Sequence, residues 1–238
     1  MPRLFVPLRL EVGAEVRLPA TAAHRVREVL RLRVGETLTV FDGHGGEYHA
    51  EVRRCARDGV DLALGAHRAV MRESPLQITL AQGLARGERM DFTLQKSVEL
   101  GVSRIVPLAT ERSQVKLDAE RAARRTAHWR ALILHACEQC GRDQVPELSA
   151  VMRIADFIAA DDAEVRLTLA PTGKLSLKNL SPEARRFSLV IGPEGGLSPP
   201  EIELLATHGY RAARLGPRIL RTETAALVAL TALQTLHG

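Results

Sequence analysis

The stretch FSLVIGPEGGL, residues 187–197, decides the fold of this chain. Its first half is an apolar run typical of a strand buried on both faces, and its second half holds three glycines that end the strand. Directly behind it, Ser198 and Glu201 have the spacing of a capping box and Pro199 occupies a first-turn position, so a helix is predicted to begin here. A strand, a glycine loop and a helix N-terminus in succession favour a ligand site, because backbone N–H groups are free there and a ligand can approach the main chain.

The glycine spacing indicates what kind of ligand such a loop binds. G-x-x-G-G differs from the dinucleotide fingerprint G-x-G-x-x-G, and no Gly-Lys-Ser/Thr follows as in a Walker loop. A nucleotide pyrophosphate is therefore not the first expectation. A second loop, residues 216–221, follows a strand predicted at 211–215 and precedes a helix predicted to begin at Thr222. The sequence thus predicts two loops that converge at strand ends.

Two kinds of pattern divide the chain. The first 70 or so residues predict short strands separated by turns, with one helix at 22–32, and such strands commonly close into a small barrel. The polar segment 65–75 separates them from strands that alternate with helices, which is typical of a mainly parallel sheet covered by helices on both faces. We therefore expect two domains, 1–72 and 73–238.

The composition limits the class of protein. The chain has 238 residues, 45% of them hydrophobic, and no apolar run reaches membrane-spanning length, so we expect a soluble globular protein in the cytoplasm. A net charge of +5 weakly favours an RNA partner, whereas 3% aromatic residues disfavour a protein that stacks a series of single-stranded bases. Cys55, Cys137 and Cys140 are too few for a disulfide framework, and no second ligand pair has zinc-site spacing, so we expect reduced thiols and no metal.

Two longer motifs near the C-terminal end resemble those of a known family. IGPEGGLSPPEIELL at 191–205 and LGPRILRTETAALVAL at 215–230 are similar to the signature motifs of the bacterial 16S ribosomal RNA (uracil-N3)-methyltransferases, members of the SPOUT superfamily. Shorter stretches that also resemble this family lie at 41–52, 86–108, 111–121 and 136–148. The resemblance covers nearly the whole chain.

This resemblance implies an α/β fold in which a C-terminal SPOUT-type trefoil-knot domain follows a small N-terminal PUA-like β-barrel that binds RNA. It also implies S-adenosylmethionine as the cofactor, a homodimer, and 16S rRNA in the small ribosomal subunit as the substrate. Threaded chains are very rare, so the knot rests on the resemblance alone.

A pocket for S-adenosylmethionine needs close backbone approach, hydrogen bonds to the purine edge and apolar walls around a sulfonium. Three loops at strand ends combine glycines with short apolar residues and suit these needs. The predicted cofactor-binding residues are Leu169, Ala170, Pro171, Ile191, Gly192, Pro193, Glu194, Gly195, Gly196, Leu215, Gly216, Ile219, Leu220 and Thr222.

Methylation of uracil N3 requires loss of the proton that N3 carries at neutral pH, which leaves negative charge on the neighbouring carbonyl oxygens. An arginine stays cationic and can stabilise that charge. The hypothesis is that Arg221 polarises or positions the uracil, with Arg142 and Arg112 on phosphates or base oxygens. The alternative for Arg221 is a structural pair with Glu223 or Glu194.

The proton acceptor stays open between Glu194, Glu138 and solvent. The predicted catalytic residues are Arg221, Arg142 and Glu138, and the predicted RNA-binding residues are Arg3, His24, Arg25, Arg31 and Arg112. For the basic helix at 22–32, a solvated face is an equally supported interpretation.

Three classes of function follow from these patterns. The leading hypothesis is a ribosomal RNA methyltransferase. The alternative from another class is an RNA-binding ribosome assembly factor that retains the knot without methyl transfer, and the intact motif glycines argue against it. An unrelated nucleotide-dependent enzyme is disfavoured by the missing Walker and dinucleotide spacings.

Overall fold

The computed structural model describes residues 1–70, 72–116 and 118–238, and the chain divides into two compact units. The first unit comprises Met1–Glu73 and Cys137–Val145, and the second comprises Ser74–Ala136 and Pro146–Gly238. The domains predicted from the sequence, 1–72 and 73–238, differ from this division at Glu73 and in the segment 137–145. The structure places that segment with the first unit because its side chains pair with residues of that unit, as described below.

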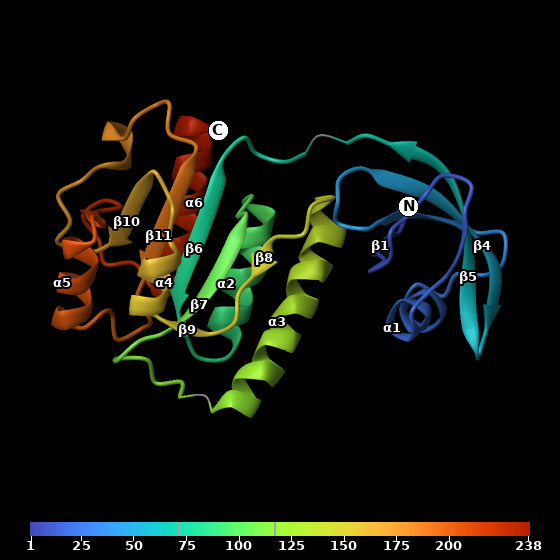
Figure 1. The fold of residues 1–238 in the computed structure, drawn as a ribbon, viewed down its shortest axis with the longest axis horizontal. Helices are drawn as coiled ribbons and strands as arrows, with labels where there is room; N and C mark the ends of the chain where they lie inside the picture. Colours follow the sequence, from blue (N-terminus) through green and yellow to red (C-terminus); the bar gives the residue numbers. More distant parts are fainter. Residues whose placement is uncertain (71, 117) are drawn as a thin grey trace. The chain divides into compact units, whose positions relative to one another are not determined.

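The first unit is built on a five-stranded, barrel-like sheet with the order β1-β3-β4-β5-β2 (Figure 1). Its strands are β1 (Arg3–Phe5), β2 (Glu15–Arg17), β3 (Thr37–Phe41), β4 (Glu47–Ala56) and β5 (Gly59–Arg68). β1 is parallel to β3, and the other neighbours are antiparallel. Two register shifts in the β4–β5 ladder mark bulges, which bend a strand and increase its twist. Leu4, Val26, Leu38, Val52 and Leu62 are fully buried in the core that this curved sheet encloses.

The helix predicted at 22–32 is shorter than expected. α1 (Ala20–His24) continues into a π-helical segment, η1 (Arg25–Val29). Arg31 then adopts a φ of 54°, in the left-handed region, so the right-handed helix cannot continue through it. No glycine or proline marks this end, and the sequence pattern therefore predicted too long a helix.

The second unit contains a parallel sheet with the order β12-β10-β11-β6-β7-β8, and β9 also pairs with β7. Its strands are β6 (Gln77–Gly83), β7 (Arg104–Ala109), β8 (Glu147–Leu148), β9 (Met152–Arg153), β10 (Val165–Leu169), β11 (Arg186–Ile191) and β12 (Arg211–Ala213). Its helical segments are α2 (Glu88–Glu99), α3 (Ala119–Cys140), α4 (Ile154–Ala160), η2 (Leu177–Asn179), α5 (Pro199–Thr207) and α6 (Thr222–His237), of which the last turn of α3 belongs to the first unit. The predicted α/β class is confirmed, whereas the trefoil knot stays a prediction.

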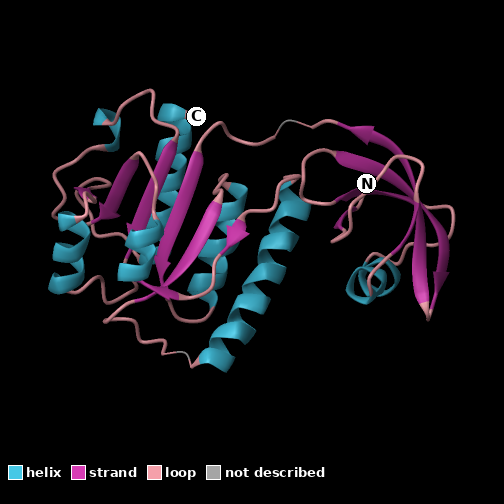
Figure 2. Ribbon diagram, in the orientation of Figure 1, coloured by secondary structure: helices cyan, strands magenta, loops and turns pink. Residues whose placement is uncertain are grey.

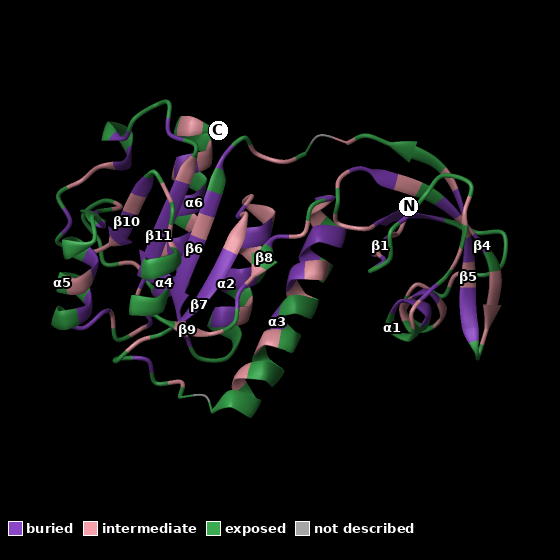
Figure 3. Ribbon diagram, viewed as in Figure 1, coloured by how far each residue is buried: buried purple, intermediate pink, exposed green. Residues whose placement is uncertain are grey.

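Helices cover both faces of the parallel sheet (Figure 2). On one face, α4 and α5 pack over a cluster that includes Ala81, Val106 and Val190, which are register neighbours on three strands. On the other face, α2 and α6 contact each other. β11 is buried from Phe187 to Ile191, as Figure 3 shows for the central strands. Because parallel strands end at one edge, the loops after β6, β7, β10, β11 and β12 meet there.

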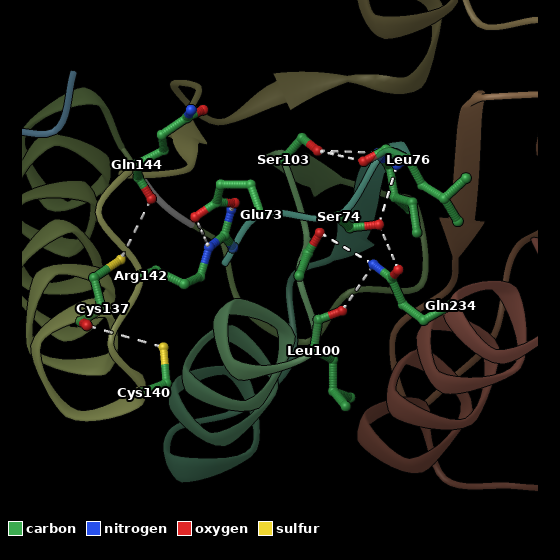
Figure 4. Close-up of polar contacts among 12 residues, drawn as sticks. Glu73, Ser74, Leu76, Leu100, Ser103, Cys137, Cys140, Arg142, Gln144 and Gln234 are labelled. Carbon is green, nitrogen blue, oxygen red and sulfur yellow. Dashed lines mark hydrogen bonds and ion pairs between the residues drawn. The ribbon is translucent and has the colours of Figure 1, made fainter. Parts of the chain in front are cut away.

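The far end of α6 is fixed by one glutamine (Figure 4). Gln234 Oε1 accepts a hydrogen bond from Ser74 Oγ at 2.6 Å, and Gln234 Nε2 donates to Leu100 O at 3.2 Å. These bonds join the C-terminal end of α6 to the segment that precedes β6 and to the C-terminal end of α2. They hold the helix whose first turn reaches the strand ends described next.

None of the described helices combines the length and the apolar character that a membrane span requires.

Candidate active site

The loop after β11 is closed by its own sequence. Ser198 Oγ accepts from Glu201 N at 3.3 Å and Glu201 Oε2 accepts from Ser198 N at 2.8 Å, so the capping box predicted for α5 is present. The second carboxylate oxygen of Glu201 accepts from Glu111 N at 2.8 Å, which ties the loop after β7 to the same helix start. The start of α5 thus fixes two neighbouring loops.

Gly192 and Gly83 occupy positions that admit no side chain. A Cβ at Gly192 would lie 2.8 Å from Gly196 C and 2.9 Å from Leu197 N, which are backbone atoms of the same loop. A Cβ at Gly83 would lie 2.6 Å from Pro193 N. The loops after β6 and β11 therefore pack main chain against main chain.

Thr222 connects the second loop to this arrangement. Its Oγ1 donates to Gly192 O at 2.6 Å and accepts from Gln82 Nε2 at 2.8 Å, so the first residue of α6 lies between the ends of β6 and β11. Gly216, with a φ of 88°, provides the left-handed turn that lets the chain run from β12 back to this helix.

A pocket of about 630 Å³ lies among these loops. It is lined from the ends of β10, β11 and β12, from the first turn of α6, and from Arg89 of α2. Of the predicted cofactor-binding residues, all line this pocket except Gly195 and Gly216. Arg218 lies in the predicted loop 216–221, and the lining residues that sequence reasoning missed are Arg89, Thr168, Thr172, Leu197, Ile202, Ala212, Ala213, Arg214 and Ala225.

Arg89 carries the ion pairs of the pocket wall. Its guanidinium lies 3.2 Å from Glu194 Oε1 and 4.0 Å from Glu223 Oε1. Burial raises the pKa of Glu194, but hydrogen bonds donated by Arg86 N and Arg89 outweigh it and hold that pKa below its usual range. Glu194 is therefore an ionised group and a poor proton acceptor.

Arg218 and Arg221 are exposed at the pocket mouth. In the described part of the chain, no ion pair forms at either of them. The carboxylates that could have paired with Arg221, Glu194 and Glu223, are bound by Arg89 instead. The structural role considered for Arg221 therefore has no support in the contacts, and its guanidinium remains available to a ligand.

Glu138 and Arg142, predicted to act in catalysis, lie in the first unit and do not line the pocket. Glu138 accepts two hydrogen bonds from Arg25, both at 2.6 Å, and one from Phe5 N at 2.9 Å. Arg142 binds Glu73 through two hydrogen bonds of 3.1 and 2.5 Å (Figure 4). Both contacts fix the segment 137–145 within the first unit.

The residues predicted to bind RNA fall into two groups. Arg3 forms an ion pair with the buried Glu47 and donates to Arg142 O, and Arg25 is bound to Glu138, so both make structural contacts. The other three, His24, Arg31 and Arg112, are exposed. Arg112 lies beside the first glycine loop, where its side chain donates to Gly195 O at 3.4 Å. RNA binding by these residues stays a prediction.

Replacing Arg25 with alanine is expected to destabilise the first unit. The Glu138 side chain is only 7% exposed, and breaking a buried ion pair typically costs about 3–5 kcal/mol because one charge stays buried without its partner. We expect the free energy of unfolding to fall by about 3 kcal/mol in urea titrations. Arg33→Ala, at an exposed position, is the matched control. An Arg25→Ala protein as stable as this control would contradict the structural role.

The three cysteines differ in reactivity. Burial raises the pKa of the Cys137 thiol to about 12, so it carries almost no thiolate near neutral pH. Cys55 and Cys140 are less buried. We expect iodoacetamide at pH 8 to label Cys137 at least about a hundredfold more slowly than Cys140, as measured by peptide mass spectrometry, with equal labelling in denaturant as the control. Equal rates in the folded protein would contradict this assignment.

Among the described residues, no group of three or more histidine, cysteine, aspartate or glutamate side chains could hold a metal ion.

Known proteins share this arrangement over the whole chain. A methyltransferase from Legionella pneumophila, solved with its bound cofactor SAM, superposes with a TM-score of 0.94 at 42% identity, covering 98% of this chain and 96% of the other. The ribosomal RNA small subunit methyltransferase E from Neisseria gonorrhoeae, bound to S-adenosyl methionine, gives a TM-score of 0.92 at 38% identity, covering 99% and 98%. The ribosomal RNA small subunit methyltransferase E of Buchnera aphidicola subsp. Schizaphis graminum is 31% identical over 100% of this chain and 97% of its own.

Two family profiles divide the chain between them. The RNA methyltransferase PUA domain matches residues 27–64, within the first unit, and the RNA methyltransferase domain matches residues 72–234. The second match covers more than half of the chain and includes every loop of the pocket. The chain therefore belongs to the RNA methyltransferase family.

Proposed function

We propose that this protein transfers a methyl group from S-adenosylmethionine to N3 of a specific uridine in 16S rRNA of the small ribosomal subunit. The observation that carries the proposal is the pocket at the strand ends of the parallel sheet, where two glycine loops and the start of α6 meet. Relatives solved with S-adenosylmethionine share the fold over nearly their whole length.

The residues of the pocket fit this cofactor. Thr168 Oγ1 is a buried pocket-wall atom without a hydrogen-bond partner among the described residues, so it is free to bind a polar group of a ligand. Ile191, Leu197 and Leu220 supply apolar wall, and the ionised Glu194 favours a cationic sulfonium. When bound, the cofactor supplies an electrophilic methyl group.

Arg221 is the residue proposed to act on the acceptor. Uracil N3 becomes a nucleophile only as it loses its proton, and the resulting negative charge spreads to the carbonyl oxygens. An arginine within about 4–6 Å typically lowers the pKa of an acid by about 1–3 units, so Arg221 promotes ionisation of the base and holds it in place. Since the pKa of Glu194 is lowered, solvent is proposed to take the proton.

Family membership implies an RNA substrate, and we propose that this substrate is the assembled small subunit in the cytoplasm. The PUA-type first unit is proposed to contact RNA through His24 and Arg31. A homodimer is proposed as the working form, as the resemblance to the uracil-N3 methyltransferases implies.

The test is to incubate the protein with radiolabelled S-adenosylmethionine and small subunits from a strain that lacks the gene. The modified nucleotide is then mapped by mass spectrometry. N3-methyluridine at one position of 16S rRNA is the expected product. Label on another base would contradict the proposed target nucleotide but support the proposed cofactor. Tight cofactor binding without any methyl transfer would overturn the proposed activity.

A further inference from the structure

A second hollow lies beside the pocket described above. It has a volume of about 450 Å³ and is lined by Arg86, Glu88, Arg89, Gln114 and Glu194. Arg89 and Glu194 also line the first pocket, so the two hollows share one wall. Its residues come from the segments that follow β6, β7 and β11, and it therefore opens at the same edge of the sheet.

We infer that this hollow binds the acceptor base, with Gln114 as a specificity-determining residue that donates a hydrogen bond to a carbonyl oxygen of the uracil. The inference rests on the proposed function, because it deepens the description of that same reaction. It adds a place for the acceptor next to the place proposed for the cofactor.

The charges of the hollow favour a base over a phosphate. The positive charges of Arg86 and Arg89 are balanced by the negative charges of Glu88 and Glu194. The lowered pKa of Glu194 keeps its carboxylate ionised. A phosphate in this hollow would meet both carboxylates at short range, where like charges repel. A uracil enters as a neutral ring without this penalty, and its carbonyl oxygens, which take up negative charge only when N3 loses its proton, can accept hydrogen bonds from the two arginines.

The residues on either side of Gln114 are hydrogen-bonded, while the side chain of Gln114 is available. The hydroxyl of Ser113, its neighbour, donates to Leu84 O at 2.9 Å and accepts from Val115 N at 3.2 Å. The Gln114 side chain is exposed, and no hydrogen bond to its amide is found in the described part of the chain. A primary amide offers two donors and one acceptor, which suits the oxygens of a pyrimidine.

The chemistry of the acceptor fits such an arrangement. N3 lies between the two carbonyl carbons of uracil and has to stay accessible to receive the methyl group. A protein can therefore hydrogen-bond to this edge of the base only through the two carbonyl oxygens. Gln114 supplies a donor for one of them. Arg89, on the shared wall and 44% exposed at its side chain, supplies a donor for the other while it keeps its contact with Glu194.

The inference is tested with two variants and a matched control. In Gln114→Ala, kcat/KM for small subunits is expected to fall about tenfold because one hydrogen bond to the base is lost, while affinity for S-adenosylmethionine is unchanged. In Gln114→Glu, a carboxylate replaces the donor, and the fall is expected to be about a hundredfold. Gln139→Ala, an exposed glutamine on α3, is the control. Both Gln114 variants within twofold of wild type would overturn the inference.

A second measurement separates this inference from the proposed function. Small subunits that carry 4-thiouridine in 16S rRNA are irradiated with the wild-type protein, and cross-linked peptides are identified by mass spectrometry. Cross-links to the peptides that contain residues 86–89 or Gln114 support the acceptor site whether or not methyl transfer is seen. Cross-links confined to other peptides overturn it. If the wild-type protein binds the cofactor but makes no N3-methyluridine, the proposed function is contradicted instead.

Discussion

Gly192→Ala is expected to lower the affinity for S-adenosylmethionine by about a hundredfold and to lower turnover with it. The added Cβ would lie 2.8–2.9 Å from backbone atoms of Gly196 and Leu197, and no flexible side chain is available to move away. Overpacking of this kind typically costs about 1–3 kcal/mol, and here the loop that must shift is a wall of the pocket. Isothermal titration calorimetry with the cofactor measures the affinity directly.

Gly65→Ala is the matched control for this glycine. A Cβ at Gly65 would meet its nearest neighbour, in His49, at 3.5 Å, which is ordinary van der Waals contact. Affinity and turnover of this variant should equal those of wild type. Thermal unfolding of both variants shows whether any loss at Gly192 is local to the loop. Wild-type cofactor affinity in Gly192→Ala would mean that the close packing of this loop does not shape the site.

Local sequence signals account for the parts of the site that lie within one motif. The buried strand β11, the capping box of Ser198 and Glu201, and the start of α6 at Thr222 each depend on neighbouring residues, so the sequence alone predicts them. The same holds for the pocket residues of the glycine loops, which flank predicted strands.

Residues that reach the site from distant elements could not be predicted in this way. Arg89 belongs to α2 and enters the pocket wall only because β6 pairs with β11, and its partner Glu194 lies more than a hundred residues further along the chain. Glu138 and Arg142 were predicted near the strand ends because they lie in family motifs. Both belong to the first unit, since the last turn of α3 pairs with Arg25 and the chain that follows α3 pairs with Glu73. No local pattern records either pairing.

Arg221→Ala is expected to reduce kcat by about a hundredfold to a thousandfold while cofactor affinity changes by less than about threefold. The magnitude is that of removing one charge-stabilising donor from an active site. Arg221 is the N-cap residue of α6, but its side chain makes no capping hydrogen bond, and the bond from Ala225 N goes to its backbone oxygen. Alanine therefore leaves the helix start intact, so a loss of turnover reports on chemistry. Single-turnover assays with small subunits measure kcat, and calorimetry measures affinity.

Two further variants separate the charge of Arg221 from its shape. Arg221→Lys keeps a cation but loses the planar fork of donors, so its kcat should lie between those of wild type and Arg221→Ala. Arg130→Ala, an exposed arginine on α3, should behave as wild type. If Arg221→Ala turned over at the wild-type rate, the uracil anion would have to be stabilised elsewhere, and Arg89 on the wall shared by the two hollows would be the next cation to test. Loss of cofactor affinity instead of kcat would make Arg221 a cofactor-binding residue, because only an interaction confined to the transition state lowers kcat alone.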